Sequence, residues 1–277
     1  METPSSPLPP TPDKRARVRE MFDTIAPRYD FCNKLMTFGL DGHWRRRTIS
    51  LLAAPPGSLI ADVGSGTGDL ARALVGSGYR AIGVDLSMGM LKAGHSGGAS
   101  MVLADAAMMP MGDRAVDAAV SGFALRNFAE IHAVVVEFAR VVRPGGRIAL
   151  LEVALPEHPL MKIGHRLWFN HFVPRIGAAF SDAAAYRYLP ASVAYLPSHD
   201  ELAGMLADAG FTSTRRDLLS GGVVQVVTAT RVGLRTGTAS MAVATLAAAA
   251  DGAGAVVAAG AAGAAGAAGT ASQGEPE

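Results

Sequence analysis

The sequence is short of cysteine and of charge. Cys32 is the one cysteine in 277 residues, so no disulfide can form within the chain. Charged residues make up 18% and the formal net charge is +1, which gives no indication of a nucleic acid or another polyelectrolyte as partner. No clustered set of histidines and cysteines has the spacing of metal ligands. We therefore expect neither a disulfide framework nor a bound metal.

Both ends of the chain lack the patterns of folded or targeting segments. Residues 1–13 are rich in proline and contain no apolar stretch of the kind found in a secretory signal. Residues 233–277 are mostly alanine and glycine, which is typical of a low-complexity tail. A membrane span in this tail is a weaker alternative, because leucine, isoleucine and phenylalanine are scarce there. We expect a cytoplasmic protein with one folded domain over residues 14–232.

Between these ends, apolar runs with the period of strands alternate with segments that have the period of helices. We expect helices over residues 14–26, 33–38, 43–53, 69–75, 87–93, 131–142 and 200–209. We expect strands over residues 58–63, 80–85, 100–104, 116–120, 147–153, 211–219 and 223–230. The alternation predicts an α/β fold with a doubly wound, mostly parallel seven-stranded sheet and an antiparallel hairpin at its C-terminal end. Residues 14–57 form a helical cap in this interpretation, and residues 156–197 a cap or lid over the substrate.

A glycine-rich turn follows the first expected strand. It reads DVGSGTGD over residues 62–69, with Gly64, Gly66 and Gly68 spaced as G-x-G-x-G. Dinucleotide sites use G-x-G-x-x-G instead, and Asp69 at the start of the helix would repel a pyrophosphate. S-adenosylmethionine carries a sulfonium and an amino group and no phosphate. The turn therefore favours S-adenosylmethionine over a nicotinamide dinucleotide.

Acidic residues stand at the ends of three expected strands. Asp62 directly precedes the glycines, where it can orient the amine of a methionine moiety. Asp85 ends the second strand, where a carboxylate can accept two ribose hydroxyls, and Asp105 with Ala106 follows the third, where they can bind an adenine edge. The carboxyl ends of parallel strands meet at one edge of the sheet, so these positions predict one cofactor site.

The chain resembles the ubiquinone/menaquinone biosynthesis C-methyltransferases, a family of class I S-adenosylmethionine-dependent methyltransferases with a Rossmann-like fold. The matching segments are VREMFDTIAPRYD (18–30), NKLMTFG (33–39), DVGSGTGD (62–69), FALRN (123–127), RVVRPGGR (140–147), VPRIG (173–177) and YRYL (186–189). The resemblance implies cofactor contacts at Thr67, Asp85, Asp105 and Ala106. It implies one more at Gly122, where the family usually has serine; here Ser121 is the neighbouring residue.

The resemblance also implies the reaction, which is methylation of a ring carbon of a prenylated hydroquinone, most simply of demethylmenaquinol to menaquinol. Arg126 and Asn127 follow the fourth strand, and we expect Arg126 to stabilise the phenolate and Asn127 to orient the ring. Tyr29 is expected to close over the cofactor, with Asp30 either beside it or capping the next helix.

Three features of substrate handling stay open at this point. The general base is not identified among His165, His171 and Tyr186. A lipid groove is expected in the 156–197 cap, whose apolar side chains include Trp168, Phe169, Phe172, Val173 and Phe180. Residues 14–47 hold nine basic and four acidic side chains, so the run 45–47 (RRR) predicts a peripheral contact with anionic lipid. A homodimer stays possible.

Other functions compete with this interpretation. One is a C- or O-methyltransferase of another lipid or a secondary metabolite, against which the LRN and YRYL segments speak. A nicotinamide oxidoreductase is disfavoured by the glycine spacing. A non-catalytic subunit that binds the cofactor or a lipid is disfavoured by the presence of Asp85 and Arg126.

Overall fold

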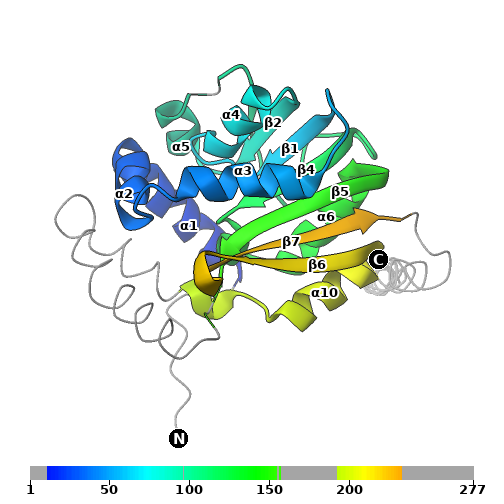
Figure 1. Cartoon of the computed structure of the whole chain (residues 1–277). Helices are drawn as coiled ribbons and strands as arrows, with labels where there is room; N and C mark the ends of the chain where they lie inside the picture. Colours follow the sequence, from blue (N-terminus) through cyan, green and yellow to red (C-terminus); the bar gives the residue numbers. More distant parts are fainter. Residues whose placement is uncertain (1–10, 96, 155, 157–191, 233–277) are drawn as a thin grey trace, which may run out of the picture. The chain divides into compact units, whose positions relative to one another are not determined.

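The computed structural model describes residues 11–95, 97–154, 156 and 192–232 (Figure 1). A seven-stranded sheet forms the centre, with strand order β3-β2-β1-β4-β5-β7-β6. Its strands are β1 (Leu59–Val63), β2 (Arg80–Asp85), β3 (Ser100–Leu103), β4 (Val116–Gly122), β5 (Val142–Val153), β6 (Phe211–Leu219) and β7 (Val224–Arg231). Only β7 runs against its neighbours β5 and β6. The predicted doubly wound sheet with a C-terminal antiparallel hairpin is confirmed.

Helices cover both faces of the sheet because the strand residues alternate in direction. Along β5, Ile148 and Leu150 pack in one core with helices α6 (Ile131–Val141) and α10 (His199–Asp208). Their neighbours Ala149 and Leu151 pack in a second core with α3 (Asp41–Leu52) and α4 (Asp69–Gly76). Figure 1 shows α3 lying across the sheet on this second face. Both faces are therefore buried, as a doubly wound fold requires.

The sheet order reverses between β1 and β4, since β2 and β3 lie on one side of β1 and the later strands lie on the other. In open α/β sheets, a crevice forms at the carboxyl ends of the strands where the order reverses. The turn after β1 and the loops after β2, β3 and β4 all end at this edge. The topology therefore puts the glycine-rich turn at the place where ligands bind.

Three elements precede α3 at the N-terminal end: α1 (Thr11–Ile25), the 3-10 turn η1 (Ala26–Arg28) and α2 (Tyr29–Met36). Asp23 at the end of α1 accepts hydrogen bonds from the Ser87 hydroxyl at 2.6 Å and the Gly89 amide at 2.7 Å. These bonds join α1 to the start of α5 (Met88–Ala93). The N-terminal helices are therefore fixed at the ligand-binding edge of the sheet.

Two expected elements begin four or more residues before their predicted starts. The helix expected over residues 33–38 begins four residues earlier, at Tyr29, because Pro27 interrupts the chain for only one 3-10 turn. It ends at Met36, since Phe38 (φ 52°) and Gly39 (φ 71°) adopt left-handed conformations that no α-helix continues. The strand expected from residue 147 begins at Val142, with a register shift opposite β4 that takes up the intervening residues.

Several expectations fall outside the described residues. They include the proline-rich start, the alanine and glycine tail, most of the expected 156–197 cap, and with it the candidate bases and groove residues His165, His171, Tyr186, Trp168, Phe169, Phe172, Val173 and Phe180. Within the described ranges, no helix is both long enough and apolar enough to cross a membrane.

Candidate active site

The turn after β1 has backbone geometry that only glycine adopts easily. Gly64, Gly66 and Gly68 have φ of 72°, 56° and 83°, in the left-handed region where a side chain is strained. Gly64 has a second reason to be glycine, because a Cβ there would lie 2.4 Å from the Cβ of Ala124. The turn therefore exposes bare backbone along its inner side.

Asp85 fixes this turn from the end of β2. Its carboxylate accepts the Gly66 amide at 2.7 Å and the Ser87 amide at 2.8 Å, so it ties the glycine turn to the start of α5. Burial raises the pKa of Asp85, and the bonds from Ser87 and Gly66 partly oppose that rise. The side chain is thus held at a fixed orientation at the ligand-binding edge.

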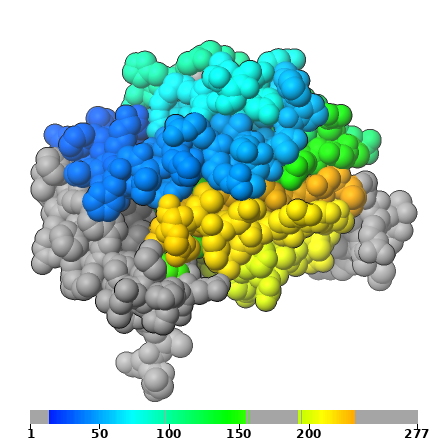
Figure 2. Space-filling model, viewed as in Figure 1, coloured from blue at the N-terminus to red at the C-terminus, as the bar shows by residue number. Residues whose placement is uncertain are grey.

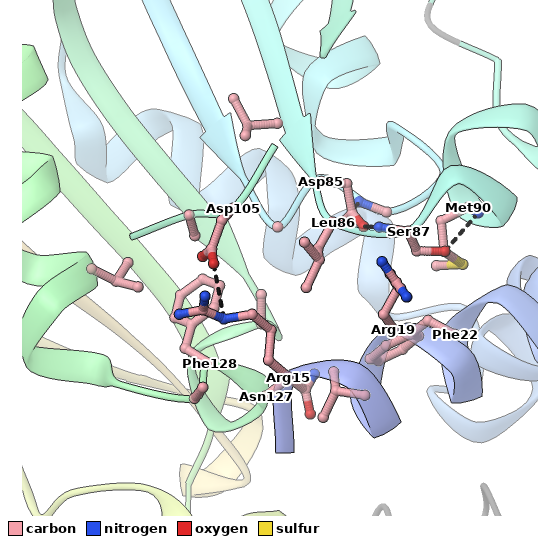
Figure 3. Close-up of a pocket in the computed structure, with 18 of the residues that line it drawn as sticks. Arg15, Arg19, Phe22, Asp85, Leu86, Ser87, Met90, Asp105, Asn127 and Phe128 are labelled. Carbon is pink, nitrogen blue, oxygen red and sulfur yellow. Dashed lines mark hydrogen bonds and ion pairs between the residues drawn. The ribbon is translucent and has the colours of Figure 1, made fainter. Parts of the chain in front are cut away.

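A pocket opens between this edge and the N-terminal helices (Figure 3). The space that it encloses, including the open solvent at its mouth, is about 820 Å³. Six of the predicted cofactor residues line it: Gly64, Gly66, Asp85, Asp105, Ala106 and Gly122. Of the predicted catalytic residues, Tyr29 and Asn127 line it.

Four predicted site residues do not line the pocket: Asp62, Thr67, Gly68 and Arg126. Thr67 donates its hydroxyl hydrogen bond to Asp30 at 2.6 Å, so this pair joins α2 to the glycine turn. Asp30 lies in the first turn of α2 and does not cap the following helix. Gly68 is the N-cap of α4.

Asp62 lies buried at the end of β1, where only 1% of its surface is exposed. Neither carboxyl oxygen has a partner with full hydrogen-bond geometry. Burial raises the pKa of Asp62 to about 7, and the backbone amide of Ala71 opposes this rise. A buried carboxyl group with so little hydrogen bonding is costly in a folded protein, so a cationic ligand group beside Asp62 would be stabilising.

Arg126 forms a buried ion pair with Glu152, and their side chains are only 9% and 2% exposed. Its guanidinium also lies 6.0 Å from the centre of the Phe123 ring, and Phe123 lines the pocket. The Arg126 Nε atom has no hydrogen-bond partner in the described part of the chain. The positive charge of Arg126, which Glu152 partly offsets, therefore lies next to Phe123 of the pocket lining.

Tyr29 lines the pocket and lies close enough to Arg126 for the charge of Arg126 to act on its phenol. Its ring meets Phe22 edge to face, with centroids 6.1 Å apart. Burial raises the pKa of Tyr29, while the positive charges of Arg126 and Arg45 oppose the rise. The phenol therefore keeps its proton at neutral pH and can donate a hydrogen bond.

One face of α1 forms a pocket wall that sequence reasoning missed. Arg15, Val18, Arg19 and Phe22 all line the pocket, and Figure 3 shows Arg15 reaching Asp105 while Arg19 points toward Leu86 and Ser87. Arg15 Nε lies 2.9 Å from Asp105 Oδ2. The spacing i, i+3, i+4, i+7 of these four residues is the sequence signal that puts them on one helix face.

Asp69 has a different role from the one assumed for it. It pairs with Arg45 at 2.6 Å and with Arg72, and it does not line the pocket. Arg45 also pairs with Asp41 at 2.8 Å. Arg45 is therefore occupied in joining α3 to α4, which leaves it unsuited to the lipid contact expected of residues 45–47.

Ser121 does not replace the serine missing at Gly122. Its hydroxyl is buried and donates a hydrogen bond to the Val63 carbonyl at 2.7 Å, beneath the pocket. Asn127 donates to the Phe123 carbonyl at 3.3 Å, which orients its amide at the pocket edge.

The fold is that of the class I methyltransferases. A phosphoethanolamine N-methyltransferase 2 of Haemonchus contortus, solved with S-adenosyl-L-methionine, matches with a TM-score of 0.59 at 12% identity over 78% of this chain and 60% of that one. A methyltransferase of Thermotoga maritima, described as a possible histamine N-methyltransferase, matches with a TM-score of 0.56 at 17% identity over 77% of this chain and 99% of that one. At these identities, the likeness concerns the fold alone.

The sequence defines the family more narrowly. Residues 11–231 match the ubiE/COQ5 methyltransferase family, and the chain belongs to it. A ubiquinone/menaquinone biosynthesis C-methyltransferase UbiE of Syntrophotalea carbinolica is 39% identical over 77% of this chain and 93% of that protein. A demethylmenaquinone methyltransferase of a Roseiflexus species is 39% identical over 82% of this chain and 98% of that protein. The predicted family is confirmed.

Proposed function

We propose that this chain transfers a methyl group from S-adenosylmethionine to a ring carbon of a prenylated hydroquinone, with demethylmenaquinol as the acceptor in menaquinone biosynthesis. The family match and the names of the relatives support the reaction class. The observation that carries the proposal for this chain is the pocket, which is lined by Asp85, Asp105 and the glycine turn together with Tyr29 and Asn127.

The residues at the pocket fit S-adenosylmethionine. Gly64 lines the pocket with backbone alone, because a Cβ there would clash with Ala124. Asp62 lies buried at the end of β1, behind the glycine turn, where its charge would favour the cationic amine of a methionine moiety. Asp85 would hold the ribose hydroxyls, and Asp105 with Ala106 the adenine edge. When bound, the cofactor supplies an electrophilic methyl group on a positively charged sulfur.

The chain's own residues would activate and position the acceptor. The Arg126 charge behind Phe123 favours loss of the acceptor's phenolic proton, because it stabilises the developing phenolate. Tyr29 would donate a hydrogen bond to the acceptor oxygen, and Asn127 would orient the ring. Phe22, Phe123 and Phe128 line the pocket and limit the access of water, which strengthens these electrostatic interactions.

The test of the acceptor is turnover of the purified full chain with S-adenosylmethionine and two reduced quinones of equal prenyl length. We expect faster methylation of the demethylated naphthoquinol than of the benzoquinol. A preference for the benzoquinol would refute demethylmenaquinol as the acceptor but would still support methylation of a prenylated hydroquinone. Methylation of neither would refute the proposal.

A further inference from the structure

Helix α1 is anchored at both of its ends by residues other than Arg15. Near its start, the Lys14 ammonium is buried and donates a hydrogen bond to the Phe128 carbonyl at 2.8 Å. At its end, Asp23 accepts the two hydrogen bonds that join α1 to the start of α5. In Figure 2 the dark blue N-terminal helices and the segment beside them form one continuous surface. Helix α1 is therefore held at the pocket from two sides.

The ion pair between Arg15 and Asp105 adds a third contact between α1 and the pocket. Arg15 Nε lies 2.9 Å from Asp105 Oδ2, and the two side chains are 49% and 21% exposed. An ion pair at such exposure contributes little to folding stability, because water screens the charges. Both residues line the pocket, and Figure 3 shows the Arg15 side chain extending from α1 to Asp105. We therefore look for the role of this pair in the pocket itself.

Arg15 completes the bonding of the Asp105 carboxylate. The Ala107 amide donates a hydrogen bond to Asp105 Oδ1 at 2.9 Å, while Arg15 pairs with Oδ2. One partner on each oxygen fixes the plane of the carboxylate, whereas the Ala107 bond alone lets it turn about the Cβ–Cγ bond. An ionised carboxylate has about four lone-pair sites, so each oxygen retains a site for a ligand donor.

A carboxylate in a fixed plane can distinguish two kinds of purine. A 6-aminopurine such as adenine presents an N–H donor, which the carboxylate accepts. A 6-oxopurine such as hypoxanthine presents an oxygen whose lone pairs face those of the carboxylate, and a polar site that is mismatched in this way rejects the ligand. A carboxylate that can turn binds the amine less well and also avoids the oxygen. Its discrimination between the two purines is therefore smaller.

We propose that Arg15 is a positioning residue that sets the preference of the pocket for a 6-aminopurine over a 6-oxopurine, because it fixes the carboxylate of Asp105. The proposal rests on the proposed function in one respect, namely that the adenine of S-adenosylmethionine lies at Asp105. Arg15 acts on the base through Asp105 and not by a contact of its own.

The first experiment is calorimetry of the full chain with S-adenosylhomocysteine and with S-inosylhomocysteine, in which an oxygen replaces the 6-amino group. Wild type should bind the adenosyl compound about 10–100-fold more tightly, the effect of one hydrogen bond to a charged group. Arg15→Gln should lower this ratio about fivefold, the upper range for an exposed ion pair. The matched control is Arg17→Gln, which removes the same charge from an exposed residue of α1 outside the pocket lining and should keep the wild-type ratio.

The second experiment tests whether Arg15 acts through Asp105. Arg15→Lys keeps the cation and should keep part of the ratio. Asp105→Asn should remove most of the preference, because an amide can present either a donor or an acceptor to the base. Arg15→Gln added to Asp105→Asn should then change the ratio less than about twofold, since residues that act together have non-additive effects. A further fivefold change in that background would mean that Arg15 acts on the ligand directly, which would refute the positioning role.

Three results of the first experiment would overturn the proposal. An unchanged ratio in Arg15→Gln would leave Arg15 as a surface ion pair alone. Tighter binding of S-adenosylhomocysteine by Arg15→Gln would mean that Arg15 competes with the base for Asp105. An equal loss of preference in Arg17→Gln would mean that the charge of α1 acts on the ligand without a specific contact.

Failure of this proposal can be distinguished from failure of the proposed function, because the binding measurements need no acceptor. A wild-type chain that prefers the adenosyl compound but methylates no hydroquinone would refute the proposed function and leave the role of Arg15 supported. Methylation by wild type together with full purine preference in Arg15→Gln would refute the role of Arg15 alone. Binding of neither compound by wild type would refute both.

Discussion

Substitutions of Arg126 and Glu152 can separate the catalytic role of the Arg126 charge from its role in stability. Both side chains are nearly inaccessible to solvent, and the Glu152 carboxylate also accepts the Val153 amide at 2.9 Å. Arg126→Ala leaves the Glu152 charge buried without its partner, and breaking a buried ion pair in this way costs about 3–5 kcal/mol. A loss of activity in this variant alone would therefore have two explanations.

The double variant Arg126→Gln/Glu152→Gln removes both charges. Glutamine matches Glu152 in shape and is shorter than Arg126, and the two amides can bond to each other. We expect its free energy of unfolding to lie within about 1–2 kcal/mol of wild type, since a buried ion pair can often be replaced by neutral groups. Its kcat should still fall about tenfold, a loss of about 1.4 kcal/mol of transition-state stabilisation, because Arg126 acts from outside the pocket lining and Glu152 offsets part of its charge. Arg126→Lys keeps the cation and should lose less.

The assays are urea unfolding of each variant and turnover at saturating S-adenosylmethionine. A double variant with both wild-type stability and wild-type kcat would refute the reasoning, because the charge would then serve only to hold the loop after β4 against β5. A double variant that is as unstable as Arg126→Ala would contradict the explanation of the ion pair's stability effect.

Three further predictions follow from the site and the sequence. Asp85→Ala should weaken S-adenosylmethionine binding, measured by calorimetry, by about 1.5–3 kcal/mol. Part of this loss would come from the Gly66 amide, which loses its acceptor. Unchanged affinity would show that Asp85 does not bind the cofactor. The free energy of unfolding should decrease as pH rises from about 4 to about 7, because burial raises the folded pKa of Asp62 from 3.8 to about 7 and the folded state binds its proton more tightly than the unfolded state does. Asp62→Asn should flatten this pH dependence. Equal slopes for the variant and wild type in urea unfolding at several pH values would contradict the assignment to Asp62. Truncation after Arg235 should leave folding and turnover intact, because an alanine and glycine repeat buries little apolar surface; a loss of activity would show that the tail has a function.

The sheet was predictable from sequence because each strand is a short apolar run between turn residues. The expected and observed limits of β2 are identical, and β6 also agrees. The boundary of β5 was wrong because its first residues carry Pro144 and two glycines, which usually mark a turn. Here they form an irregularity within the strand, where Gly145 takes φ 79°.

The site was predictable where it depends on strand ends and hidden where it depends on tertiary contacts. Asp85 and Asp105 follow from topology, since parallel strands end at one edge. The pairing of Arg126 with Glu152 joins residues far apart in sequence, and no local pattern signals it. Arg15 was missed for a similar reason: an arginine on an N-terminal helix looks like a solvent-exposed residue until the fold places it beside Asp105.

The proposed methylation is best tested by mass spectrometry of the product that the purified chain forms from S-adenosylmethionine and reduced demethylmenaquinone. We expect the product to gain one methyl group and fragmentation to place it on a ring carbon. The Asp85→Ala variant should form the same product more slowly at limiting cofactor. A methyl group on a ring oxygen, or an unchanged quinol in the presence of bound S-adenosylmethionine, would contradict the proposed reaction.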